Sequence, residues 1–174
     1  DLAAQSGGDV DFPPALQWAR RPIWFSGQNM IVWGLGLPLG LLSMAVIFDI
    51  LHLFTGNTTF SVAAYWNIVA GLITGLAAAI FGLLDWLAIP SGTRAKAVGA
   101  MHGGGNVVVV LLFAVSWWLR RDNVDYVPDT LAFVLGLAAF ALAGLTGWLG
   151  GELVYRLRMG VDDGAHLNAP NSLS

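Results

Sequence analysis

The sequence has no cysteine and very little charge. Without cysteine, the chain cannot form disulfides, hold an iron–sulfur cluster through thiolates or use thiol chemistry. Only 11% of its 174 residues are charged, whereas a soluble globular domain carries about 25%. The sequence also lacks the basic block typical of proteins that bind nucleic acid. A chain of this kind cannot cover a large surface with polar groups.

Apolar residues are abundant instead, at 56% of the chain, and they gather in four long runs. A helix of about 20 apolar residues crosses the roughly 30 Å hydrocarbon core of a bilayer. The predicted spans cover residues 29–54, 62–89, 95–119 and 130–155. We therefore predict an all-α polytopic membrane protein, a bundle of four transmembrane helices in contact with membrane lipid.

The ends of the chain differ from these runs. Residues 1–27 mix aromatic side chains with arginines, as in a segment that lies at the headgroup level. Residues 28–158 form the predicted transmembrane domain, and residues 159–174 form a polar C-terminal tail.

Lysine and arginine mark the cytoplasmic side of a membrane protein. Four spans place the N-terminal segment, the middle loop and the C-terminal tail on one side. That side contains most of the basic residues: Arg20, Arg21, Arg94, Lys96, Arg156 and Arg158. On the other side, Arg120 and Arg121 are diluted by Asp122 and Asp125. We predict that both termini are cytoplasmic.

Small residues recur at spacings near four along the spans, which lets helices approach closely in lipid. The glycines predicted to pack in this way are Gly71, Gly75, Gly82, Gly99, Gly103, Gly147 and Gly151. Pro38 lies inside the first predicted span, where proline usually kinks a helix.

The predicted topology sorts the polar residues inside the spans into two groups. The cytoplasmic pole contains Asp85, His102, Asn106, Glu152 and Arg156. The outer pole contains Asp49, His52, Tyr65 and Asn67. Polar groups are costly within a membrane, and they often mark ligand or proton sites.

Each pole has a structural interpretation beside the functional one. At the cytoplasmic pole, Asp85 would accept a hydrogen bond from His102 or from backbone amides, and Glu152 would pair with Arg156. At the outer pole, Asp49 and His52 lie near the interface and would be hydrated. The competing interpretation is a ligand or proton site at the cytoplasmic pole.

A cofactor hypothesis rests on histidine, a common haem ligand. His52 and His102 are predicted near opposite membrane faces, too far apart to hold one iron. A single axial ligand at His102 is left open, for a haem or for a chlorophyll or bacteriochlorophyll magnesium. The glycines that follow, Gly103, Gly104 and Gly105, would let a flat macrocycle approach the backbone.

Three stretches resemble a known family. They are PLGLLSMAVIFDILHLFTG from Pro38, GLLDWLAIP followed by Thr93-Arg94 and by His102 and Asn106, and GWLGGELVYR from Gly147 with Gly160-Val161-Asp162. Over residues 34–163, the chain resembles small bacterial predicted membrane proteins with four helices, classed as a domain of unknown function. Some members are joined to Rieske iron–sulfur domains. The resemblance implies a location in the bacterial inner membrane.

The chain departs from the family pattern at one position. Family members commonly carry a histidine just before the proline of the first span, whereas this chain has Gly36-Leu37-Pro38. A two-histidine site between the first and third spans would therefore keep only its His102 half here.

Three hypotheses about function follow. The first is a non-catalytic accessory or scaffolding subunit of a larger respiratory or photosynthetic membrane complex, bound to other membrane subunits. It follows from the lack of a complete catalytic set, the missing histidine and the glycine stripes. The second is a redox protein that binds a haem or chlorin through His102. The third is a small proton or ion pathway that links Asp49 with Asp85.

Overall fold

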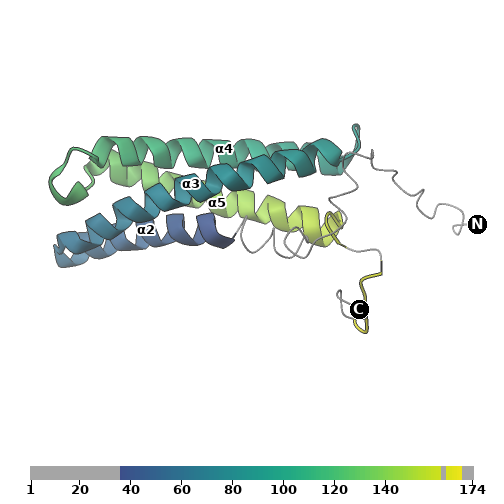
Figure 1. Cartoon of the computed structure of the whole chain (residues 1–174), viewed down its shortest axis with the longest axis horizontal. Helices are drawn as coiled ribbons and strands as arrows, with labels where there is room; N and C mark the ends of the chain where they lie inside the picture. The colour runs from purple at the N-terminus through teal and green to yellow at the C-terminus, as the bar shows by residue number, and fades with distance from the viewer. Residues whose placement is uncertain (1–35, 162–163, 170–174) are drawn as a thin grey trace, which may run out of the picture.

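The computed structural model describes residues 36–161 and 164–169. Four helices lie side by side in a bundle: α2 (Leu37–Thr55), α3 (Thr58–Ala88), α4 (Arg94–Arg120) and α5 (Thr130–Gly151) (Figure 1). The 3-10 turn η5 (Val124–Tyr126) precedes α5, and the π-helical turn η6 (Glu152–Arg156) continues it. No strand occurs in the described residues.

The described helices are long and apolar enough to make four membrane spans, which confirms the predicted fold class. The chain is a multi-pass membrane protein. The predicted N-terminal segment and the beginning of the first predicted span lie outside the described residues.

Local signals set the ends of the helices. Gly56 ends α2 in the left-handed conformation, with φ of 68°, which glycine adopts at little cost. Asn57 begins α3, because its Oδ1 accepts from the Thr59 amide at 3.0 Å. The predicted outer loop at residues 55–61 is therefore only two residues long. Asp129 caps α5 as the sequence predicts, by accepting from the Ala132 amide at 2.7 Å.

Pro38 lies at the beginning of the described part of α2. The described residues begin at Gly36, which already has helical backbone angles, and the residues before it lie outside the described part of the chain. The kink expected inside the first span therefore stays a prediction.

The bundle consists of two antiparallel hairpins, α2–α3 and α4–α5, whose helices make most of their contacts within each pair. The connections 56–57 and 121–129 meet at one end of the bundle, called here the double-loop end (left in Figure 1). The connection 89–93 and η6 lie at the other, the single-loop end.

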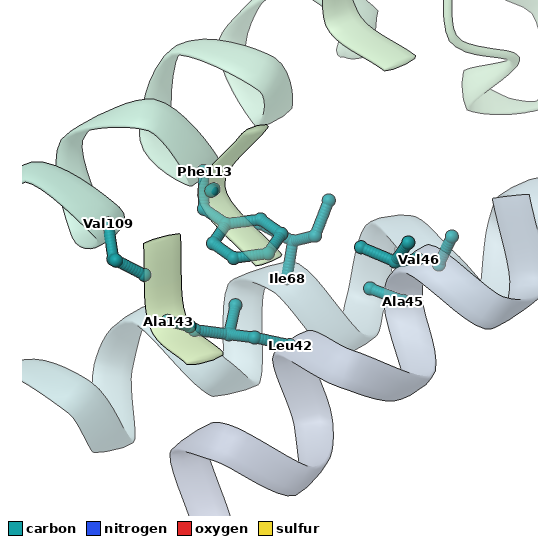
Figure 2. Packing of buried hydrophobic residues seen from close by; sticks show 9 residues of the cluster. Leu42, Ala45, Val46, Ile68, Val109, Phe113 and Ala143 are labelled. Carbon is teal, nitrogen blue, oxygen red and sulfur yellow. The ribbon is translucent and has the colours of Figure 1, made fainter. Parts of the chain in front are cut away.

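A small apolar core joins the hairpins (Figure 2). Phe113 of α4 is fully buried, and Val109 lies one turn away on the same helix. They pack with Leu42 and Val46 of α2 and Ile68 of α3. The half of α3 nearer the single-loop end exposes large apolar side chains instead: Ile73, Leu76, Ile80, Phe81, Leu83, Leu84 and Leu87. These side chains face away from the rest of the chain.

Three of the seven predicted packing glycines contact another helix. A Cβ atom added at Gly71 would lie 2.7 Å from Leu42, one at Gly99 would lie 2.9 Å from Trp86, and one at Gly75 would lie 3.8 Å from Pro38. At Gly71 and Gly99 a larger residue would force the neighbouring side chain to shift, whereas at Gly75 an added Cβ would make an ordinary van der Waals contact.

The other four glycines do not pack against a neighbouring helix. At Gly82, Gly103 and Gly147 an added Cβ would meet nothing within 4 Å, and at Gly151 it would meet only Tyr155, a few residues further along the chain. A packing role for these four glycines stays a prediction that would need a partner helix, because a spacing of four residues marks a stripe on a helix but not the neighbour it faces. Gly105 and Gly150, which were not predicted, make the close contacts between α4 and α5.

Candidate functional site

Polar side chains inside the bundle form two clusters. The ion-pair cluster consists of Asp49, Ser116, Arg120 and the Ala132 carbonyl, near the double-loop end. The histidine cluster consists of His102, Asn106 and Thr146, nearer the single-loop end.

The ion-pair cluster is sealed from its surroundings. Nη1 of Arg120, the last residue of α4, donates to Oδ1 of Asp49 on α2 at 2.8 Å, and the two side chains are 0% and 3% exposed. Nη2 of Arg120 donates to Ser116 Oγ at 3.0 Å, and Ser116 Oγ donates to the Ala132 carbonyl at 2.7 Å. The cluster therefore ties together α2, α4 and α5.

This arrangement corrects the predicted outer pole. The sequence placed Asp49 in a hydrated position and Arg120 in a loop, but both are buried. The reason is that α4 continues through Arg120, and Ser116, four residues earlier, lies on the same inward face. One signal was present in the sequence: an aspartate within an apolar span requires a cation at the same depth.

The remaining residues of the outer pole do not join the ion-pair cluster. His52 Nδ1 lies 3.2 Å from the Asn57 carbonyl and helps to close the α2–α3 turn. The side-chain amide of Asn67 donates to the Ala63 carbonyl of its own helix at 2.8 Å. Tyr65 is buried and stacks on Tyr126, with ring centroids 3.9 Å apart. The predicted outer pole is therefore not one site.

The histidine cluster is neutral. His102 Nδ1 lies 2.8 Å from the Thr146 carbonyl, and a carbonyl only accepts, so this nitrogen carries the proton. Nε2 then accepts from the Asn106 side-chain amide at 3.1 Å. The hydroxyl of Thr146 donates to Asn106 Oδ1 at 2.8 Å. The sequence predicted that His102 and Asn106 share a face, but it gave no indication of Thr146.

Two glycines make room for this cluster. A Cβ atom at Gly105 would collide with the Thr146 side chain, and one at Gly150 would lie 3.1 Å from the His102 ring. The bare backbone at both positions lets α4 and α5 approach closely enough for the hydrogen bonds to form.

The geometry at His102 bears on the cofactor hypothesis. An Nδ1–H that donates to a backbone carbonyl is the arrangement that orients many metal-binding histidines. The other nitrogen would be the ligand atom, and here it accepts from Asn106. The residues fit a haem or chlorin only if Asn106 moves away. Among the residues described, no group of three or more histidine, aspartate or glutamate side chains is placed to hold a metal ion.

Asp85 lies outside the histidine cluster, contrary to the predicted pairing with His102. Its neighbour Trp86 faces α4 instead: Trp86 Nε1 donates to the Lys96 carbonyl at 3.1 Å, and Lys96 Nζ donates to the Trp86 carbonyl at 2.7 Å. Because consecutive helical residues point about 100° apart, Asp85 faces outward and is exposed.

Glu152 joins two basic side chains at the single-loop end. Its Oε2 lies 3.8 Å from Arg156 Nε, which is the predicted pair. Its Oε1 makes a shorter contact with Arg94 Nη2, at 2.6 Å. Arg94 was not among the predicted site residues, since it begins α4 and is distant from Glu152 in the sequence.

These features define a four-span membrane protein with two internal polar clusters. A family model described as "Predicted membrane protein (DUF2231)" matches residues 31–163. The chain therefore belongs to the DUF2231 family of predicted membrane proteins, in agreement with the resemblance seen in the sequence.

A curated relative comes from Geobacillus stearothermophilus. Its maltose permease is 25% identical over 144 residues, which is 82% of this chain and 33% of the permease. The chain thus spans about a third of the length of that relative. No solved structure matches the chain.

Proposed function

We propose that this protein is a non-catalytic accessory subunit of a larger complex in the bacterial inner membrane, respiratory or photosynthetic in character. The observation that carries the proposal is a groove between α2 and α5 with a volume of about 370 Å³. Its lining includes Leu39, Ser43 and Phe140 and the small residues Ala143, Gly144 and Gly147.

The small residues that line this groove suit the approach of a transmembrane helix. Added Cβ atoms at Gly144 and Gly147 would meet nothing within 4 Å, so the described part of the fold does not require glycine there. Small residues on an outward membrane face let the backbone of another helix approach closely. The groove is therefore the expected docking site for a helix of a partner subunit.

The internal polar groups support a structural role. Asp49 is engaged by Arg120, and both ring nitrogens of His102 have partners. Neither cluster presents an unoccupied nucleophile next to a base, the arrangement that covalent catalysis needs. Both clusters join helices to one another, as polar contacts in membrane bundles commonly do.

The proposal is tested by extracting the tagged protein from its native membrane with a mild detergent. We expect the wild type to migrate with larger partners, and Gly147→Leu to lose them, because the leucine side chain fills the groove. Gly104→Leu is the matched control, since Gly104 is equally open but lies on α4, outside the groove. A wild-type protein that migrates alone, or an equal loss in both variants, contradicts the proposal.

A second proposed function is a redox protein with a haem or chlorin at His102. The specific observation in its favour is the Nδ1 bond to the Thr146 carbonyl, at 2.8 Å, which orients the ring as in many metal sites. An absorbance spectrum of the native complex separates the two proposals. A Soret or chlorin band that disappears in His102→Gln, with the complex intact, supports the redox function.

The third hypothesis is a small proton or ion pathway that links Asp49 with Asp85. The interior of this chain gives it less support than the other two. Asp49 is locked to Arg120, Asp85 faces outward, and an apolar core that includes Leu42 and Phe113 occupies the middle of the bundle.

A further inference from the structure

The two ends of the bundle carry different charge. At the single-loop end the described residues include four cations, Arg94, Lys96, Arg156 and Arg158, and two acids, Asp85 and Glu152. At the double-loop end, Arg121 stands beside three acids, Asp122, Asp125 and Asp129. Arg120 is excluded from this comparison because Asp49 neutralises it inside the bundle.

The excess positive charge at the single-loop end is concentrated around Glu152. This carboxylate lies 2.6 Å from Arg94 and 3.8 Å from Arg156. One carboxylate neutralises only one of two guanidinium groups. The Glu152 side chain is 14% exposed, whereas those of Arg94 and Arg156 are 62% and 77% exposed. Among the described residues, two guanidinium groups are thus brought together by one carboxylate, with one unit of positive charge unbalanced.

The position of this cluster in the membrane indicates which anion could bind to its two arginines. Trp86 packs against Lys96, which follows Arg94 by two residues, with Lys96 Nζ 3.9 Å from the centre of its ring, and exposed Trp148 precedes Glu152 by one helical turn. Tryptophan gathers at the headgroup level of membrane proteins. Arg94 and Arg156 therefore lie at the depth of lipid phosphates, and guanidinium groups bind phosphate oxygens through paired N–H donors.

We propose that Arg94 and Arg156, held together by Glu152, bind the phosphate of an anionic phospholipid headgroup at the single-loop end. Arg94 begins α4 and Arg156 ends η6. A lipid phosphate bound to both arginines would therefore connect the first and the last residues of the α4–α5 hairpin. This role is independent of the docking groove between α2 and α5, which involves none of these residues.

The experiment uses the full chain reconstituted in phosphatidylcholine, with spin-labelled phosphatidylglycerol or phosphatidylcholine as the probe. Electron paramagnetic resonance then gives the relative association constant of the two lipids. A basic residue near an anionic surface contributes about 1 kcal/mol, or about a fivefold change in association. We expect phosphatidylglycerol to be preferred about fivefold or more by the wild type, and the preference to disappear in Arg94→Gln/Arg156→Gln.

Two further variants make the test specific. Arg121→Gln removes an exposed arginine at the double-loop end and is expected to leave the preference unchanged. Glu152→Gln keeps a side-chain oxygen that can accept from Arg94 but removes the negative charge, so it is expected to increase the preference, and an unchanged preference would contradict the charge argument. If the double variant fails to fold, Glu152→Gln and the single variant Arg156→Gln provide the same comparison.

Competition with inorganic phosphate distinguishes a site for lipid phosphate from a site for a soluble anion. Added at constant ionic strength, it should leave the lipid preference unchanged, because soluble phosphate does not concentrate at the membrane surface. Competition by millimolar phosphate would instead assign the site to a soluble anion and overturn the lipid proposal. Equal lipid preference in the wild type and the double variant, or an equal loss in Arg121→Gln, would also overturn it.

Discussion

The two internal clusters hold the same bundle together by different means. The ion-pair cluster is charged and almost fully buried, and it joins three helices from both hairpins. The histidine cluster is neutral and only partly buried, and it joins α4 and α5 within one hairpin. Both lie within helices that are otherwise apolar.

The difference follows from the cost of burying charge. A charged side chain in a membrane interior requires a partner and further hydrogen bonds, and Arg120 obtains them from Asp49 and Ser116. A neutral imidazole costs less to remove from water than a charged group does. His102 can therefore remain partly exposed to lipid without a charged partner. The comparison indicates that the ion pair fixes how the hairpins meet, and that the histidine cluster fixes the register inside one of them.

The largest expected effect comes from breaking the ion pair. Asp49→Ala leaves Arg120 buried without its counter-charge, which costs about 3–5 kcal/mol for buried pairs. The free energy of unfolding, measured by detergent titration with tryptophan fluorescence, should fall by that amount.

The control removes both charges. Asp49→Leu/Arg120→Met leaves no unpaired charge, and replacing a buried pair by apolar residues is often neutral or stabilising. We expect this double variant to be far more stable than Asp49→Ala. Equal destabilisation of the two variants would show that packing around Asp49, and not its charge, determines stability at the double-loop end.

A second prediction concerns the close approach of α4 and α5. Gly105→Ala places a methyl group against the Thr146 side chain, and such overpacking costs about 1–3 kcal/mol. Thr146→Ser removes the methyl group that obstructs it and keeps the hydroxyl that donates to Asn106. The double variant should recover much of the loss.

Gly103→Ala is the matched control on the same helix, because an added Cβ there meets nothing. It should be neutral, or more stable by up to about 1 kcal/mol from helix propensity. If Gly103→Ala is destabilised as much as Gly105→Ala, the contact with Thr146 is not the cause.

A third, smaller effect is expected in the histidine cluster. His102→Gln keeps a donor and an acceptor, and hydrogen bonds between membrane helices average about 0.6 kcal/mol and reach about 1.7. The variant should therefore lose less than about 2 kcal/mol in the same titration. A loss near that of Asp49→Ala would remove the distinction between the neutral and the charged cluster.

The fourth prediction involves no change in stability and tests the orientation of the bundle. Single cysteines at Asn57 and Asn123 should react with an impermeant thiol reagent in intact cells, and one at Ser91 should not, because the lysine and arginine bias predicts that residues 89–93 are cytoplasmic. Labelling at Ser91 alone would reverse the assignment of the two ends.

The sequence predicts the four helices well because long apolar runs and capping residues are local features. Asp129 and Pro90 indicate helix ends without knowledge of any neighbour. The predicted grouping of Asp85 with His102 was wrong, because only the rotation of α3 decides that Trp86, and not Asp85, faces α4.

The missed members of the sites share one physical reason. Arg120 and Thr146 resemble an ordinary interfacial arginine and an ordinary helical threonine in the sequence. Their roles depend on partners 71 and 40 residues away in the chain, and spacing along one helix carries no information about such pairs. The lone carboxylate of Asp49 was the usable clue, since it required a cation at the same depth.

The separation between Asp49 and Arg120 also has a consequence for biogenesis. The two-residue connection at Gly56 and Asn57 lets α2 and α3 enter the bilayer as one helical hairpin while the rest of the chain is still being synthesised. Until α4 arrives, Asp49 lacks its Arg120 partner, and a lone carboxylate is costly within lipid. Formation of the ion pair therefore depends on the second hairpin joining the first.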